Sequence, residues 1–486
     1  MTTSIKQGSW GCFATLVAAA MGCSGAPADE GVGETPPGAI PPGDAPSSGE
    51  PTDSSSSVPP GDSPPANPPG DAPPGDSPAT PPLAQAGFEL LISDVPQQSP
   101  SAEAATNPAF VEGNRAFALD VYRELDTEPK NFFFSPNSIS TALAMAHLGA
   151  RGQTQQEMSE ALHFDVSEEA LHAGFNALGR ELASRQLEAT EAHVGVTLRT
   201  NNDIWAHVRE ELRPLPSYVD ALGQHYGAGV KLVDFDQAEQ ARETINTEVG
   251  RQTNDTVREL IPEGIIIPHH TTMVLTNTIY LKAAWASLFE EQMTFESSFT
   301  DLAGGQHAVD SMRQVAQFAH ATGPGYAAVR VPYVGEELAL TLILPDAGAF
   351  DDIEEGLTPQ FLADVAAQFE SKQVYLQVPK LEVRSNFSLK DVLESLGMVT
   401  AFDQALGDFG GIGPAQKYIQ DVVHEAFVAL DESGTEAGAA TAVVFGDESA
   451  GPEPDVDFVV DRPFILLLED LPTQSLLFMG RVVQPE

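Results

Sequence analysis

The chain has 486 residues, 42% of them hydrophobic, so it is long enough to bury at least one large core. Its 70 acidic residues outnumber 24 Lys and Arg, and the formal net charge of -46 argues against binding nucleic acid or another anionic surface through basic patches. Both cysteines, Cys12 and Cys23, lie in the first 23 residues, which excludes a disulfide, a thiolate nucleophile and a cysteine metal site from the rest of the chain.

Residues 1–23 have the pattern of a secretory signal, because Lys6 precedes an apolar run from Phe13 to Met21 that is too short to span a membrane. Ala20-Met21-Gly22-Cys23 resembles a bacterial lipobox, although Leu is usual where Ala20 stands, and Cys23 would then carry the lipid. An ordinary signal cleaved near Ala18-Ala19-Ala20 is the alternative. We favour lipidation at Cys23, with several acyl chains for stable anchoring. The protein is then exported, and is either a lipoprotein of the cell envelope or secreted.

Residues 24–106 are predicted to be a disordered spacer. They are rich in Pro, Gly, Ser and Asp, and the motif PPGD(A/S)P occurs four times, beginning at Pro41, Pro59, Pro68 and Pro73. Such a composition cannot build a core and keeps the chain extended. One folded domain is therefore expected, from residue 107 to residue 486.

The first half of this domain has mainly helical patterns. Apolar residues recur at helical spacing over 107–125, and Ser135-Pro136 is a natural start for a helix that buries Ile139, Leu143 and Leu148. Two amphipathic, acidic helices are predicted at 165–192 and 238–262, and the alternation over 194–206 indicates a strand.

The second half has mainly strand patterns. The run TTMVLTNTIYLKAAW at 271–285 is mostly apolar and rich in β-branched residues, as in a strand buried on both faces in the middle of a sheet. Further strands are predicted at 326–332, 338–344 and 374–383, and a helix at 388–396. The mixture predicts an α+β fold.

A stretch with two possible conformations follows at 430–445. From Thr435 onward it alternates as a strand does, but it has few bulky β-formers before Val443 and is flanked by Gly434 and Gly446. Composition alone would favour a plain surface strand. A segment small enough to enter a sheet and loose enough to stay outside also suits a conditional strand.

Three motifs that follow one another in order resemble the C-terminal part of the serpin family: GTEAGAATA, FVVDRPFILLL and LFMGRVVQP. The segment NFFFSPNSISTALAMAHLGARGQTQQEM resembles the first and second helices of the same family. The resemblance covers roughly residues 107–486. It implies a serpin fold, with about eight or nine helices around three β-sheets and an exposed reactive-centre loop, in a monomer without a cofactor.

Enzyme motifs are incomplete. His424-Glu425 could begin the zinc-protease motif HExxH, but Val428 stands where the second His is needed. Asp408-Phe409-Gly410 lacks the other kinase motifs, His269-His270 alone is a weak metal signal, and no G-x-S-x-G is present. No enzyme activity and no metal site are expected, and since no basic helix is present, neither is a polyanion cofactor.

The resemblance implies a function as a suicide substrate. In serpins, a serine protease attacks the exposed loop, and the cut loop inserts into the main sheet as a new strand and distorts the tethered protease. The family pattern assigns the loop hinge to Glu432, Gly434, Thr435, Glu436, Ala437, Gly438, Ala439, Ala440 and Thr441.

The hinge residues that would face the protein core on insertion distinguish an inhibitory serpin from a non-inhibitory one. Thr435, Ala437, Ala439 and Thr441 are small or apolar, and Gly438 replaces the Ala that is most frequent in inhibitory members. We therefore expect an inhibitor of serine-type endopeptidases, with a cysteine protease as the other target class. The alternative is a non-inhibitory serpin that acts as a binding or chaperone-like surface protein.

Counting fourteen residues on from Gly434 places the reactive bond at Glu448–Ser449, which implies a protease that cleaves after Glu or Asp. Asp447 and Phe445 remain candidates for the residue before the cut. The family pattern also assigns a hydrogen-bonded cluster beneath the central strands, the shutter, and a residue at the end of the sheet where insertion begins, the breach. The shutter residues are Ser135, Ser138, Asn277 and His424, and the breach residue is Trp285.

Overall fold

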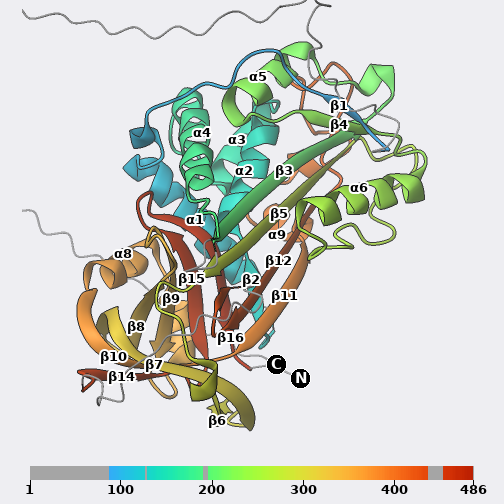
Figure 1. Cartoon of the computed structure of the whole chain (residues 1–486). Coiled ribbons are helices and arrows are strands. Elements are labelled where there is room, and N and C mark those ends of the chain that lie inside the picture. The colour runs from blue at the N-terminus through green and yellow to red at the C-terminus, as the bar shows by residue number, and fades with distance from the viewer. Residues whose placement is uncertain (1–86, 126–127, 190–194, 436–452, 485–486) are drawn as a thin grey trace, which may run out of the picture. The chain divides into compact units, whose positions relative to one another are not determined.

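The computed structural model describes residues 87–125, 128–189, 195–435 and 453–484. These residues form nine α-helices and two β-sheets (Figure 1). The helices are α1 Pro108–Leu125, α2 Pro136–His147, α3 Gly152–Ala161, α4 Glu168–Ser184, α5 Pro216–Tyr226, α6 Ala238–Gln252, α7 Phe350–Glu355, α8 Pro359–Ala367 and α9 Lys390–Ser395. The predicted α+β class is confirmed.

The first sheet has seven strands in the order β1-β4-β3-β5-β13-β12-β11. Its centre is the run predicted to be buried on both faces, and all but one of the residues of β5 are buried. The strands are β1 Glu89–Leu91, β3 Val196–His207, β4 Val230–Val233, β5 Met273–Ala284, β11 Leu381–Ser388, β12 Val422–Asp431 and β13 Gly434–Thr435.

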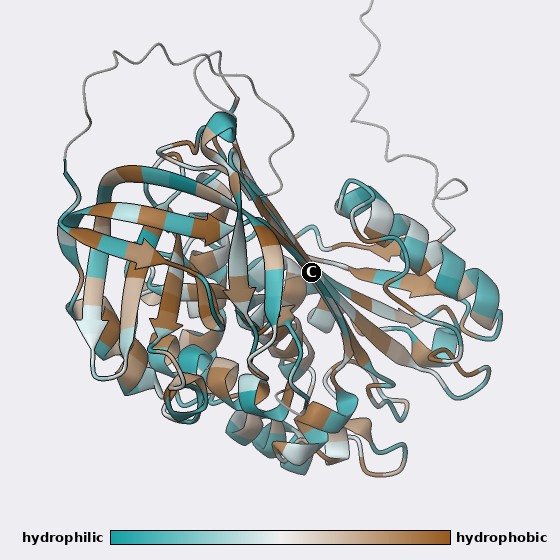
Figure 2. Ribbon diagram, turned by 90° about the horizontal axis from the view of Figure 1, so that it is seen from below, coloured by the Kyte–Doolittle hydropathy of each residue, from teal (hydrophilic) through white to brown (hydrophobic). Residues whose placement is uncertain are grey.

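Both faces of the seven-stranded sheet are covered. Alternate residues of β3 enter different cores, because Ile204 and Ala206 belong to the main core whereas Trp205 belongs to a second core. In the second core, α6 and the segment that follows it lie on the sheet, while α2 contacts β3 and β5 on the other face. Figure 2 shows hydrophobic residues gathered along the strands and hydrophilic ones on the outward sides of the helices.

The second sheet has the order β14-β10-β7-β8-β9-β15-β16-β2, and β6 also pairs with β7. The serpin resemblance implies three sheets, but the hydrogen bonds of the described strands form two, because the long strand β7 pairs with β10 along one part and with β8 along the other. The strands are β2 Phe132–Phe134, β6 Phe295–Thr300, β7 Gln306–Gly323, β8 Tyr326–Pro332, β9 Leu338–Pro345, β10 Glu370–Pro379, β14 Val456–Val459, β15 Phe464–Asp470 and β16 Ser475–Val482.

Helix α2 lies between the sheets and carries part of the functional site. Ser135 is its N-cap and accepts a hydrogen bond from the Ser138 N–H at 3.2 Å, and Pro136 occupies the first turn, as the sequence predicts. Every residue of α2 except Thr141 is buried. The start of α2 is therefore fixed against β5 and β16, both of which α2 contacts.

The strand predicted at 374–383 is wrong as a single element. Strand β10 ends at Pro379 in the nine-stranded sheet, and β11 begins at Leu381 in the seven-stranded sheet. Pro379 still pairs with Ser311 on β7 and the Lys380 N–H bonds to the Asp310 carbonyl at 2.8 Å, whereas from Leu381 onward the chain pairs with β12. The alternation of Val374, Leu376 and Val378 also shifts by one residue at this point, to Leu381 and Val383.

Two predicted helices end earlier than expected. Helix α4 ends at Ser184 rather than at 192, and α6 ends at Gln252 rather than at 262. After α6, Asn254 and Asp255 both adopt positive φ, at 50° and 62°, which stops a right-handed helix.

The predicted spacer is wrong over residues 87–106. Strand β1 pairs with β4, the Gln98 N–H bonds to the Gln224 carbonyl at 2.8 Å, and Ala105 is fully buried. Phe88 anchors this segment, since its ring packs edge-on against Trp205 at 5.2 Å. The ordered chain thus begins before residue 107. The predicted signal and residues 24–86 lie outside the described residues, among which we find no helix long and apolar enough to cross a membrane.

Candidate functional site

The seven-stranded sheet is split between β5 and β12. These parallel strands pair directly only at Leu275–Thr278 with Val422–Glu425. Further along, β13 lies between them and pairs antiparallel with both, at Ala283–Ala284 on β5 and at Leu430–Asp431 on β12. Between the directly paired residues, which we call the closed end, and β13, the edges of β5 and β12 face each other without pairing. These unpaired edges are residues 279–282 of β5 and 426–429 of β12, and we call the boundary between the two strands the seam.

The hinge enters the seam through a tight hairpin after β12. The Asp431 carboxylate accepts hydrogen bonds from the N–H groups of Ser433 and Gly434, at 2.8 and 3.1 Å. Gly434 has φ of 151°, and a Cβ there would lie 2.0 Å from the Ala283 carbonyl oxygen. Only glycine lets the chain approach β5 this closely.

Thr435, the second residue of β13, is a predicted hinge residue that lies inside the sheet. It is 2% exposed, and its hydroxyl lies 2.6 Å from the hydroxyl of Tyr333, whose pKa is raised by burial. The Tyr333 ring stacks on Trp285 with centroids 4.6 Å apart, and the Trp285 indole N–H donates to the Asp431 carbonyl at 2.9 Å. Trp285 therefore lies beside the hinge, at the end of the seam that β13 occupies.

Glu432 in the hairpin turn is held by an ion pair and a hydrogen bond. Its carboxylate accepts hydrogen bonds from Thr294 at 2.6 Å and from Lys380 at 2.8 Å. Burial by itself would raise the pKa of Glu432, but the bonds from Lys380 and Thr294 outweigh it and the pKa is lowered. The first residue of the predicted hinge is thus tied to Lys380, which lies between β10 and β11.

The four predicted shutter residues lie together beneath the closed end of the seam, and all four are fully buried. The Asn277 amide donates to the Ser138 hydroxyl at 2.6 Å, and the His424 Nδ1 lies 2.7 Å from Asn277 Oδ1. The Ser135 backbone N–H donates to His424 Nε2 at 3.0 Å, and the Ser135 hydroxyl donates to the Leu477 carbonyl at 2.6 Å. The cluster joins α2, β5, β12 and β16.

The hydrogen bonds fix the protonation of His424. Because Nε2 accepts from a backbone N–H, it carries no proton, so Nδ1 carries the proton and donates it to Asn277. Burial lowers the pKa of His424 to about 3. The neutral ring is thus the form that holds β5 and β12 together.

We expect this site to weaken the fold in acid. Between about pH 3 and 6.5 the unfolded chain binds a proton at His424 that the folded protein does not, so the free energy of unfolding rises with pH in this window, by up to about 1.4 kcal/mol per unit. Above pH 6.5 this contribution is complete and constant. Unfolding in denaturant at several pH values should therefore give a shallower slope for His424→Gln than for the wild type. His270→Gln, at an exposed position, is the control, and equal slopes in all three proteins would contradict the assignment.

Two residues of the site escaped the sequence analysis. Asn202 on β3 accepts hydrogen bonds from Asn277 and, at 3.4 Å, from Ser138, and Tyr333 contacts both Thr435 and Trp285. The pair Asn201-Asn202 inside the alternating run 194–206 is a signal that could have been noticed. Tyr333 gives no such signal.

The remaining predicted residues lie outside the described residues. These are Cys23 and the loop positions after Thr435, namely Glu436, Ala437, Gly438, Ala439, Ala440, Thr441, Phe445, Asp447, Glu448 and Ser449.

Comparisons with known proteins agree with this geometry. A family model described as Serpin (serine protease inhibitor) matches residues 112–485. An uncharacterized serpin-like protein of Thermococcus kodakarensis is 35% identical over 77% of this chain and 86% of its own length. Leukocyte elastase inhibitor A of Rattus norvegicus is 32% identical over 76% of this chain and 98% of its own. The native crystal structure of the thermophilic serpin tengpin has a TM-score of 0.71 and 25% identity, covering 81% of this chain and 97% of tengpin. The chain belongs to the serpin family.

Proposed function

We propose that this serpin irreversibly inhibits serine-type endopeptidases as a suicide substrate. The protease would cut the loop between β13 and β14, and the segment that follows Thr435 would then fill the seam as a new strand. The observation that carries the proposal is that Gly434 and Thr435 already pair with both edges of the seam. Insertion then extends an existing strand, and no new strand has to be nucleated.

The register of the seam supports this extension. Thr435 pairs with Ala283 on β5 and with Leu430 on β12. The sequence separation of these two partners equals that of Leu275 and Val422, which pair directly, so β5 and β12 keep one register along the whole seam. A strand that continues from Thr435 would therefore meet both edges in register, and β5 would not have to slide along β12. In this register Thr441 would lie between Asn277 and His424.

The same register sets the sides of the inserted strand. Asn277 and His424 face the buried cluster, and directly opposed residues of antiparallel strands face the same side. Thr435, Ala437 and the alternate residues that follow would face the core, and Glu436 would face the other side. Small uncharged side chains suit this position, since a buried unpaired charge would cost several kcal/mol.

Insertion would also break the bond that closes the seam. The 2.7 Å contact between His424 and Asn277 joins neighbouring strands. A strand placed between them would move them to about twice the usual spacing of 4.7–4.9 Å, which no direct hydrogen bond can span. The shutter cluster is thus a latch that insertion must open.

The test is covalent trapping. The mature full chain is mixed with glutamyl-specific, chymotrypsin-like and subtilisin-like serine proteases and separated on denaturing gels. We expect a band of the summed mass that survives boiling. Cleavage of the loop by the whole panel without such a band would overturn the proposal and favour the non-inhibitory alternative, a binding or chaperone-like surface protein.

The reactive bond follows from the same experiment. We expect cleavage after Glu448, so the fragment released by a glutamyl-specific protease should begin at Ser449. Glu448→Ala should abolish trapping of that protease, and Asp447→Ala should not. Mass spectrometry of the fragment decides, and a first residue of Gly446 or Glu448 would move the bond to the position after Phe445 or Asp447.

We also propose that Cys23 anchors the protein to the cell envelope through a lipid. The lipobox-like residues before Cys23 and the long Pro-rich segment after it support this location. In the producing cells, Cys23→Ser should move the protein from the membrane fraction into the soluble or secreted fraction, and Cys12→Ser should not. An unchanged distribution of the Cys23→Ser variant would contradict lipidation.

A further inference from the structure

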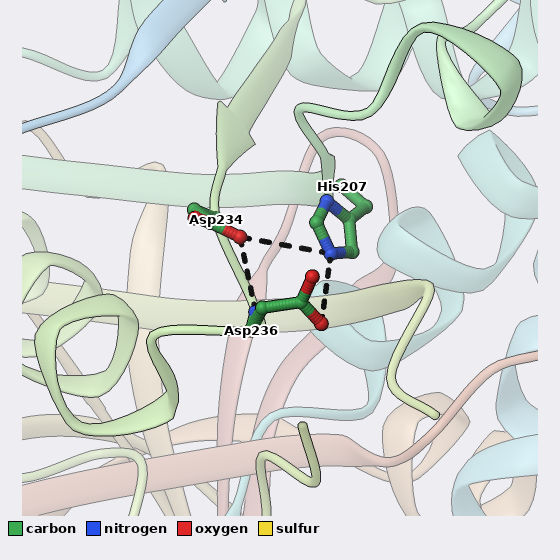
Figure 3. A group of neighbouring side chains, drawn as sticks. All are labelled: His207, Asp234 and Asp236. Carbon is green, nitrogen blue, oxygen red and sulfur yellow. Dashed lines mark hydrogen bonds and ion pairs between the residues drawn. The ribbon is translucent and has the colours of Figure 1, made fainter. Parts of the chain in front are cut away.

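Three side chains converge at the end of the seven-stranded sheet that is remote from Trp285. His207 is the last residue of β3, Asp234 directly follows β4, and Asp236 lies two residues further on, before α6. Strands β3 and β4 are parallel and His207 pairs with Val233, so both chains leave the sheet at the same point. Figure 3 shows the imidazole directed at the two carboxylates.

The imidazole of His207 has an unused nitrogen. The side chain is 1% exposed, and its Nε2 is buried without a hydrogen-bond partner. This atom lies 3.8 Å from Asp234 Oδ1 and 3.7 Å from Asp236 Oδ1, which is too far for a hydrogen bond. A buried polar atom without a partner is costly, and such atoms are rare in folded proteins. Each of the three side chains instead offers one possible ligand atom, and these atoms all lie within 4.8 Å of one another.

The two carboxylates are oriented by other contacts. Asp234 Oδ1 accepts the Asp236 N–H at 3.1 Å, and Asp236 Oδ1 accepts the His269 N–H at 2.9 Å, while Arg209 binds the other oxygen of Asp236. The hydrogen bond from Arg209 is the main reason that the pKa of Asp236 is lowered to about 2. Both side chains are therefore held with an oxygen toward His207 and with acceptor capacity left.

We propose that His207, Asp234 and Asp236 bind a divalent transition-metal ion of the zinc class. Zinc bonds to imidazole nitrogen and carboxylate oxygen are about 2.0–2.2 Å long, so donors 3.7–3.8 Å apart can share one ion. Water would complete the coordination. An imidazole donor favours zinc over calcium or magnesium, which prefer oxygen ligands alone.

Binding requires two local changes. His207 Nδ1 now accepts the Arg209 backbone N–H at 3.3 Å, so the ring proton is on Nε2. The ion would take the place of this proton, which would move to Nδ1, and the long contact with the Arg209 amide would be lost. His269 Nδ1 lies 2.8 Å from Asp236 Oδ1, but this side chain is 74% exposed and can turn away from the ion.

The position of the site indicates its role. The ion would join the ends of β3 and β4 to the start of α6, and all three ligands lie on the β3–β4 side of the seam. It would stabilise this half of the sheet without crossing the seam. The inference is independent of the inhibitory function.

The test uses the mature full chain and zinc chloride in a buffer that does not chelate metals. We expect isothermal titration to detect one saturable site per chain, and zinc to raise the unfolding temperature where an equal concentration of magnesium does not. Asp234→Asn should weaken zinc binding at least about tenfold. This variant should fold, because Asp234 is 45% exposed and the Asn oxygen can still accept the Asp236 N–H.

Two histidine variants complete the test. His207→Asn should also lose the site, while its side-chain oxygen can replace Nδ1 as the acceptor for Arg209. His307→Asn is the matched control, because His307 lies 2.7 Å from a single carboxylate, that of Asp301. The proposal would be overturned if the wild type had no saturable site, if Asp234→Asn bound zinc as tightly as the wild type, or if His307→Asn lost the site.

Discussion

Under the proposed function, replacing Thr435 with arginine is expected to turn an inhibitor of proteases into a substrate. Thr435 is 2% exposed, sits between Ala283 and Leu430, and contacts the Tyr333 hydroxyl. A guanidinium there would be buried without a carboxylate partner, at a cost of several kcal/mol. The larger side chain would keep residue 435 out of the seam before cleavage, so that insertion would have to bury it. Because each 1.4 kcal/mol added to the barrier slows insertion about tenfold, hydrolysis of the acyl-enzyme should win by about a hundredfold or more.

The measurement is the number of inhibitor molecules consumed per protease molecule trapped. Glu436→Arg is the matched control, since it introduces the same side chain one position later, on the opposite side of the inserted strand. This variant should trap protease nearly as well as the wild type. Equal trapping by Thr435→Arg and the wild type would refute the assignment of Thr435 to the hinge. If neither Thr435→Arg nor Glu436→Arg trapped protease, the claim that residues 435 and 436 face opposite sides of the inserted strand would be refuted.

Removing the side chain of Asn277 should weaken the closed sheet. Asn277 contacts His424, Ser138 and Asn202 in a fully buried position. In Asn277→Ala the Nδ1–H of His424 loses its partner, and the network to α2 loses its centre. With about 1–3 kcal/mol for each buried group left unsatisfied, we expect a loss of about 2–4 kcal/mol in the free energy of unfolding. The seam should also open more readily without its latch.

The two readouts are unfolding in denaturant and the rate at which trapping activity is lost on incubation without protease. Asn201→Ala is the control, because the side-chain nitrogen of the neighbouring Asn201 is buried without a hydrogen-bond partner and its removal should cost little. An Asn277→Ala protein as stable as Asn201→Ala would contradict the role of the latch.

Much of the fold was predictable from local sequence. Ser135 and Pro136 mark the start of α2, and the mostly apolar, β-branched run at 271–285 identifies a central strand, because capping and burial on both faces leave direct traces in neighbouring residues. The motifs around Gly434 and Arg481 identified the family before any contact was known. Predictions failed where the same local pattern fits two structures. Residues 374–383 were predicted as one strand although the chain changes sheets after Pro379, and residues 87–106 follow a Pro-rich segment although β1 within them pairs with β4.

The sequence by itself determined the family, the central strand and the residue types of the hinge, because these depend on spacing, capping and side-chain size within short segments. Only the tertiary structure decided that β5 and β12 part at Thr278 and Glu425, and that Tyr333 and Asn202 join the site. It also brought His207 to Asp234 and Asp236. These residues are distant in sequence or carry no pattern of their own, and their contacts follow from strand register and from the packing of whole elements, which local patterns do not encode.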